Sequence, residues 1–172
     1  MEQVLVLQEL ERFKSWLLQE KTSIETAHRQ EATGYQTVKA LCAMMDQLIT
    51  EFFKVSCADP EVGHDPEVAV LAVGGYGRGE LNPCSDVDLV VVTERLGTRS
   101  SDQFAKKFQY WFYDTGIKIG YQIIPIAEIN RFIHDDIKTK ASLLESRFLC
   151  GRRVLFDYFI ENIKRYIGRK PV

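Results

Sequence analysis

The sequence predicts an α+β fold, in which a small mixed β-sheet is covered by helices. Three short runs rich in β-branched residues begin at Val68, Val87 and Ile117, and each has the composition of a strand. Longer segments between and around these runs repeat apolar residues at the spacing of an amphipathic helix. A sheet flanked by helices is the simplest arrangement that buries both kinds of element.

The composition indicates an ordinary globular protein and argues against several classes of function. With 172 residues, of which 45% are hydrophobic and 27% charged, the chain can bury the core of one domain with a helical extension. A net charge of -2 gives no general attraction to nucleic acid or an anionic membrane, so any phosphate needs a local site. Neither a membrane span nor a signal-type segment is found, so we expect a cytoplasmic protein.

The first third of the chain is predicted to be helical. Residues 4–20 and the segment from Tyr35 to about Lys54 both carry an apolar stripe at helical spacing. The polar stretch between them either continues the first helix or breaks near Gly34. We therefore treat residues 1–55 as an N-terminal helical extension.

The later segments are assigned from their capping residues and periodicity. Ser100 or Ser101 is predicted to cap a helix that ends at Gly116. A third strand follows and is closed by Pro125. Beyond it the sequence predicts two or three helices, at about residues 127–134, 138–150 and 152–167. The rest of the chain is thus divided into a core and C-terminal helices packed on it, at residues 56–126 and 127–172.

The stretch over residues 70–92 contains the candidate site. Its first strand runs into Gly74-Gly75, where missing Cβ atoms let backbone N–H groups approach an anion. Its second strand begins with Asp86 and Asp88, which are two residues apart and so emerge on one face. Neighbouring carboxylates repel each other unless a cation lies between them, and Mg²⁺ prefers such oxygen ligands together with substrate phosphates. The pattern predicts a Mg²⁺ site, with Mn²⁺ as the alternative metal.

The same stretch resembles the signature of the polymerase-β-like nucleotidyltransferase superfamily, in which Gly-Gly is followed after a turn by Ser-Asp-x-Asp. More narrowly, residues 74–81, Pro83 and residues 85–89 are similar to the N-terminal catalytic domain of bacterial PII-protein uridylyltransferase/uridylyl-removing enzymes. Residues 113–120 are similar to that family's Trp-Asp-x-Gly-Leu-x-x-Gly element, and residues 143–151 resemble its downstream helix.

This resemblance, which runs from about residue 68 to about residue 156, implies both a fold and an activity. The fold would be polymerase-β-like, with metal carboxylates on neighbouring strands of a short sheet and helical extensions at both ends. The activity would be that of an enzyme, a nucleotidyltransferase of nitrogen regulation. It would transfer UMP from UTP, or the nucleotidyl group of another NTP, to a tyrosine of a PII-type signalling protein and release pyrophosphate.

The resemblance also implies roles for particular residues. Asp86 and Asp88 would hold two Mg²⁺ ions that stabilise the negative charge gathering on the triphosphate. Backbone N–H groups, a positive charge and a hydroxyl donor would bind the nucleotide, from Gly74, Gly75, Arg78 and Ser85. Arg78 could equally anchor the turn, and Glu80 is more typical of a salt bridge or helix cap than of a metal ligand.

One departure from the superfamily concerns a third carboxylate. Many members carry one on a later strand, where it helps to deprotonate or orient the nucleophile. The third predicted strand has no acid, and it has Gln122 and Ile124 where the uridylyltransferases commonly have Ser and Arg. The missing Arg predicts altered handling of the substrate. Asp114, Asp136 and Glu145 are outside candidates for the third acid, although each is more typical of a helix cap or an ion pair.

Two other classes of function stay open on the sequence alone. The chain could be a non-catalytic nucleotide-binding module, or a stand-alone nucleotidyltransferase of toxin–antitoxin type, although its charge argues against an RNA substrate. The uridylyltransferases are much longer, adding a phosphohydrolase domain and glutamine-sensing domains. Because His134-Asp135 is a weak match to a His-Asp metal pair, we expect an excised domain or a stand-alone relative, without deuridylylation or glutamine control.

Overall fold

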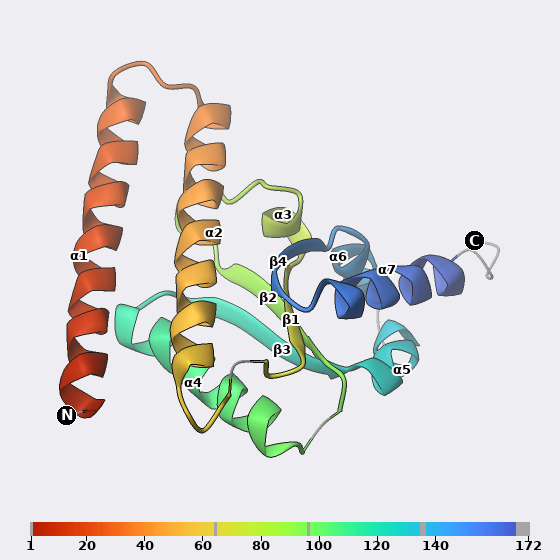
Figure 1. Ribbon diagram of the computed structural model, residues 1–172. Helices are drawn as coiled ribbons and strands as arrows, with labels where there is room; N and C mark the ends of the chain where they lie inside the picture. The colour runs from red at the N-terminus through yellow and green to blue at the C-terminus, as the bar shows by residue number, and fades with distance from the viewer. Residues whose placement is uncertain (1, 64, 96, 135–136, 168–172) are drawn as a thin grey trace.

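The computed structural model describes residues 2–63, 65–95, 97–134 and 137–167, and its centre is a four-stranded sheet (Figure 1). The strands follow the spatial order β3-β2-β1-β4. β1 is antiparallel to both β2 and β4, whereas β2 and β3 run parallel, so the predicted mixed sheet is confirmed. The bounds are β1 (Val68–Ala72), β2 (Val87–Thr93), β3 (Ile119–Pro125) and β4 (Arg147–Gly151).

Helices cover both faces of this sheet (Figure 1). One face packs on α1, α2 and α4, and the other on α5, α6 and α7. None of the helices that the structure describes combines the length and the apolar character needed to cross a membrane. Their bounds are α1 (Glu2–Arg29), α2 (Gly34–Ala58), α3 (Gly74–Gly77), α4 (Arg99–Thr115), α5 (Ile129–His134), α6 (Ile137–Leu144) and α7 (Arg153–Ile167), with a short 3₁₀ turn at Ile126–Glu128.

The central strand β1 shows why the sheet needs two helical layers. All of its residues are buried, and their side chains alternate between the two faces. Val68 and Val70 belong to the core that contains α1, α2 and α4, while Ala69 and Leu71 belong to the core on the other face. The centre of the sheet is therefore covered on both faces, whereas the edge strand β3 is only partly buried and Gln122 in its middle is exposed.

The two N-terminal helices pack side by side as a hairpin (Figure 1). Of the two alternatives for the polar stretch, α1 continues through it as far as Arg29, because this part of the helix lies on the surface and contains no Gly or Pro. α2 begins with a capping box: the Thr33 side chain accepts from the Gln36 N–H (3.2 Å), and the Gln36 side chain accepts from the Thr33 N–H (2.7 Å). The predicted second helix is confirmed.

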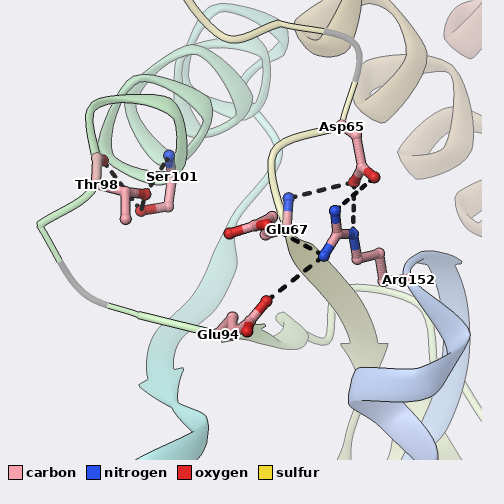
Figure 2. Close-up of polar contacts among 6 residues, drawn as sticks. All are labelled: Asp65, Glu67, Glu94, Thr98, Ser101 and Arg152. Atoms are coloured by element: carbon pink, nitrogen blue, oxygen red, sulfur yellow. Dashed lines mark hydrogen bonds and ion pairs between the residues drawn. The ribbon is translucent and has the colours of Figure 1, made fainter.

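The start of α4 differs from the prediction, and its end agrees. Thr98 is the N-cap, and its hydroxyl accepts a hydrogen bond from the Ser101 N–H at 3.2 Å (Figure 2). The predicted caps were wrong because Ser100 donates its hydroxyl to the Val62 carbonyl, and Ser101 lies inside the first turn. Gly116 ends the helix with a φ of 70°, as expected.

The last strand was missed from the sequence. Residues 138–150 were expected to form one helix, but α6 ends at Leu144 and residues 147–151 form β4. β4 pairs antiparallel with β1, whose second edge would otherwise be left open. Helical spacing of the apolar residues is a local signal, and hydrogen bonding to a strand far away in the sequence overrides it here.

Candidate active site

The glycine pair lies where β1 leaves the sheet. Gly74 begins α3, a single helical turn, and its φ of 59° is a left-handed conformation that favours glycine. Just before it, the Val73 N–H donates to the Asp88 carbonyl (3.1 Å). The structure thus brings the glycine pair and the acidic pair to the same end of the sheet.

The two acids flank the first residue of β2, and both are exposed. Asp88 lies opposite Gly120 of the parallel strand β3. A Cβ atom at Gly120 would overlap Asp88 Oδ1, and a Cβ atom at Gly74 would lie 3.7 Å from Asp88 Oδ2. The Asp88 carboxylate is therefore bordered by Gly120 of β3 and by Gly74 of α3, and its position requires that Gly120 has no side chain.

The acidic pair is not neutralised by any cation in the part of the chain that the structure describes. Partial burial of the carboxylate, and then the charge of Asp86, raise the pKa of Asp88 above its ordinary value. Both causes disfavour the ionised form. A cation placed between Asp86 and Asp88 would reverse this effect, so the electrostatics favour a metal or another positive group at this position.

Asp88 also lies in a cavity of about 350 Å³ between the sheet and α6. This volume is at the small end of the range for ligand sites. Besides Asp88, its polar lining residues include Gln122 on β3 and Ser142 on α6, and neither of these two side chains makes a hydrogen bond within the described residues. The cavity is lined by Val73, Asp88, Leu89, Val90, Gly120, Tyr121, Gln122, Ser142 and Leu143.

The two polar side chains predicted to bind phosphate differ in their surroundings, because Arg78 is held by two acids and Ser85 is exposed in a loop. The Arg78 guanidinium pairs with Glu80 (2.9 Å) and Glu145 (2.5 Å), and these contacts raise its pKa. Its remaining nitrogen, Nη2, lies 3.7 Å from the position of a Cβ atom on Gly75, so it borders the glycine pair. Ser85 is exposed next to Asp86, and its N–H donates to the Asn82 carbonyl (3.2 Å).

A third acid does not join the pair within the described residues, where no group of three metal-binding side chains is found. Asp114 interacts with the Tyr110 hydroxyl, and Glu145 pairs with Arg78. Asp136, the remaining candidate, lies outside the described residues, as does Asp135 of the weak His-Asp match. On β3, Gln122 is the polar side chain that borders the cavity.

Two residues of the site were not identified from the sequence. Gly120 had a signal, because it ends the segment that resembles the Trp-Asp-x-Gly-Leu-x-x-Gly element, but only the strand register shows that it faces Asp88. Ser142 had no comparable signal. Its hydroxyl lies 3.4 Å from the position of a Cβ atom on Gly74, which places α6 directly over the glycine pair.

The chemistry of these donors fits a divalent magnesium ion. Mg²⁺ is commonly held by one or two carboxylates, with its remaining ligands coming from water and substrate phosphates. Asp86 and Asp88 supply the carboxylates, the Asp88 carboxylate opens on a cavity, and the glycine pair leaves room for phosphates beside it. Two carboxylate ligands would leave several coordination positions for a substrate.

Comparison with known proteins agrees with this geometry. The nucleotidyltransferase domain model matches residues 61–149, which is more than half of the chain and contains both the glycine pair and the acidic pair. The chain belongs to the nucleotidyltransferase family. The resemblance inferred from the sequence motifs is therefore confirmed, and so is the fold class expected from it.

Curated relatives of this nucleotidyltransferase domain are named bifunctional uridylyltransferase/uridylyl-removing enzymes. The protein of Pseudoalteromonas translucida is 34% identical over 136 residues, which are 78% of this chain and 15% of the relative. That of Aromatoleum aromaticum is 35% identical over 136 residues, covering 79% of this chain and 15% of the relative. That of Novosphingobium aromaticivorans is 34% identical over 133 residues, covering 77% and 14%. The chain thus spans about 15% of the length of these relatives.

Proposed function

We propose that this nucleotidyltransferase domain transfers UMP from UTP to a tyrosine hydroxyl of a PII-type signalling protein, with Mg²⁺ as cofactor. The observation that carries the proposal is the acidic pair, Asp86 and Asp88, whose charge is uncompensated. This pair lies beside the single helical turn α3 (Gly74–Gly77), called the glycine turn below, at the edge of a cavity. The curated relatives, which are named uridylyltransferase/uridylyl-removing enzymes, support uridylyl transfer as the reaction.

In this reaction the acceptor hydroxyl oxygen attacks the α-phosphorus and forms a new P–O bond, the bond to pyrophosphate breaks, and the hydroxyl proton passes to solvent water. Mg²⁺, when bound, neutralises the charge that develops on the phosphate oxygens. Asp86 and Asp88 would hold the metal at the mouth of the cavity. Their fixed positions orient the reacting groups, which accounts for much of the rate enhancement in this kind of transfer.

The triphosphate would lie along the glycine turn. Backbone N–H groups at Gly74 and Gly75 can approach phosphate oxygens because neither residue has a side chain. Arg78 would contribute through Nη2, which borders Gly75 while Glu80 and Glu145 hold the rest of the guanidinium. Ser85 would add a hydroxyl donor from the loop that leads to Asp86.

The acceptor would approach from the side of β3. An in-line displacement puts the attacking oxygen opposite the leaving pyrophosphate, so a triphosphate on the β1 side places the acceptor across β2 from it. Gln122 borders the cavity on that side. It is neutral and can orient a hydroxyl but cannot act as a general base at neutral pH.

A second candidate function is nucleotide binding without turnover. It is favoured by the lack of a third acid beside Asp86 and Asp88 in the described part of the chain. A binding module would bind NTP and Mg²⁺ in a calorimeter and release no pyrophosphate, whereas an enzyme would do both. The same measurement separates the two functions.

The decisive experiment is a screen of the four NTPs with Mg²⁺ or Mn²⁺, with and without a PII-type protein. Pyrophosphate release and transfer of label from α-labelled NTP to protein are the two readouts. We expect UTP with Mg²⁺ to give both, and Asp86→Asn to abolish both. Asp65→Asn, at the other end of the sheet, is the matched control and should stay active. Undiminished transfer by Asp86→Asn would overturn the metal assignment.

A further inference from the structure

Three side chains from distant parts of the chain meet beside the glycine turn. Asp46 of α2 accepts hydrogen bonds from the Tyr76 hydroxyl (2.6 Å) and from both terminal nitrogens of Arg147 (2.7 and 3.0 Å). Arg147, the first residue of β4, also donates to the Tyr76 carbonyl (3.3 Å), and its guanidinium carbon lies 5.3 Å from the centre of the Tyr76 ring. Tyr76 belongs to α3, so the three elements α2, α3 and β4 are joined at one point.

This contact is partly withdrawn from water, which strengthens it. Tyr76 is 2% exposed, and the Asp46 and Arg147 side chains are about one-third exposed. Burial, and then the charge of Asp46, raise the pKa of Tyr76, so its hydroxyl stays protonated and donates to Asp46. A bidentate pair between Arg and a carboxylate also fixes the relative orientation of the two groups, which a single hydrogen bond does not.

The glycine turn cannot hold its own geometry. α3 is a single turn of helix, and its N-terminus has no side-chain cap. A Cβ atom on Gly77 would overlap the Glu145 carbonyl, so the turn lies directly against the chain that leads into Arg147. On its other side, the Leu81 N–H donates to the Cys42 thiol of α2 at 3.1 Å. The turn is therefore shaped by α2 on one side and by residues 145–147 on the other.

We infer that Asp46 and Arg147 are positioning residues for nucleotide binding, which act by holding Tyr76 and through it the glycine turn. This inference rests on the proposed function, because it assigns the turn to the triphosphate. The charged groups of these two residues contact each other and Tyr76, so we assign neither of them a contact with the reacting atoms. Their loss should therefore weaken triphosphate binding and leave the acidic pair in place.

The test compares two Asp→Asn substitutions that each break a bidentate pair with an arginine. Asp46→Asn breaks the pair beside the turn, and Asp65→Asn breaks the pair with Arg152 at the far end of β4. We expect Asp46→Asn to raise KM for the NTP about tenfold and to change kcat by less than about twofold. Asp65→Asn should change neither. Arg147→Lys should restore part of the loss caused by Arg147→Met, because it keeps the charge without the bidentate geometry.

A second readout does not depend on catalysis. Amide hydrogen exchange within residues 73–81 should become about tenfold faster in Asp46→Asn and stay unchanged in Asp65→Asn, because only the first substitution loosens the turn. If Asp46→Asn does not fold, Tyr76→Phe replaces it, since it removes only the hydroxyl. Its expected rise in KM is about threefold.

The outcomes separate this inference from the proposed function. If the unsubstituted protein releases no pyrophosphate from any NTP, the proposed function is wrong, and exchange within residues 73–81 decides the positioning role alone. If the protein is active but Asp46→Asn raises KM no more than Asp65→Asn does, the positioning role is wrong and the proposed function stands. Equal exchange rates within residues 73–81 in both variants would also overturn the positioning role.

Discussion

The two ends of the central sheet handle negative charge in opposite ways. At the end of the sheet away from the glycine turn, where β1 begins and β2 ends, Arg152 is surrounded by Asp65, Glu67 and Glu94 (Figure 2). Two of its nitrogens bond the Asp65 carboxylate at 2.7 Å each, and the other acids lie 3.3 and 3.5 Å from the third. At the glycine end, the acidic pair has no such partner in the described part of the chain.

The pKa values of the aspartates record this difference. Hydrogen bonding to Arg152 holds the pKa of Asp65 below its ordinary value, whereas burial and a neighbouring acid raise the pKa of Asp88. The first arrangement stabilises the fold, and the second destabilises it until a cation binds. Carboxylates of the same type are thus structural at one end of the sheet and available for chemistry at the other, which is the pattern expected of a functional site.

The largest expected effect comes from removing one charge at the glycine end. Asp88→Asn should lower NTP-dependent pyrophosphate release by about 1,000-fold or more, because under the proposed function the metal would lose one of its two carboxylate ligands. Steady-state assays with Mg²⁺ measure the loss. Asp65→Asn, the same change at the other end, should keep most of the activity. Activity of Asp88→Asn within tenfold of the unsubstituted protein would remove the functional contrast between the two ends.

A smaller effect is expected from moving the Asp88 carboxylate without deleting it. Gly120→Ala places a Cβ atom on Asp88 Oδ1, so the carboxylate has to turn away, and activity should fall about 100-fold. Gly34→Ala is the control, because a Cβ atom there meets nothing within 4 Å and the position is helical. Unchanged activity of Gly120→Ala would show that the precise direction of Asp88 does not matter.

At the opposite end the expected effect is on stability alone. Arg152→Met should lower the free energy of unfolding by up to about 1 kcal/mol, since partly exposed pairs contribute little. The pKa of Asp65 is lowered in the folded state, so its contribution is present above the ordinary Asp range and is lost as pH falls through the lowered value. Urea titrations at neutral and acidic pH measure this. If the stability difference between Arg152→Met and the unsubstituted protein grew on acidification, the stabilising role of the Asp65–Arg152 pair would be wrong.

The smallest effect has the opposite sign. Asp88→Asn should raise the melting temperature of the metal-free protein by about 1 °C at neutral pH, because it removes an uncompensated charge. The folded-state pKa of Asp88 is raised, so the wild type loses stability as pH rises through that value, and the difference should vanish in acid. Calorimetry across the pH range in EDTA tests this. A lower melting temperature for Asp88→Asn at neutral pH would mean that Asp88 is a structural residue.

Several features could be predicted because their cause is local in the chain. The β-branched runs at Val68 and Val87 form strands, and Asp86 lies close enough to Asp88 for its charge to raise the pKa of Asp88. Gly116 ends α4 because its left-handed conformation suits glycine, and that signal needs only one residue. Local signals therefore sufficed to predict the central strands, the glycine pair and the acidic pair.

Other features depend on which segments meet in space, and they became visible only in the folded chain. β4 is a strand because β1 offers it hydrogen bonds, although its own residues also suit a helix. Gly120 faces Asp88 because of the register between β2 and β3, and Asp46 meets Arg147 across 101 residues of sequence. Pairing and register come from burial and hydrogen bonding summed over the whole sheet, so no short stretch of residues carries them.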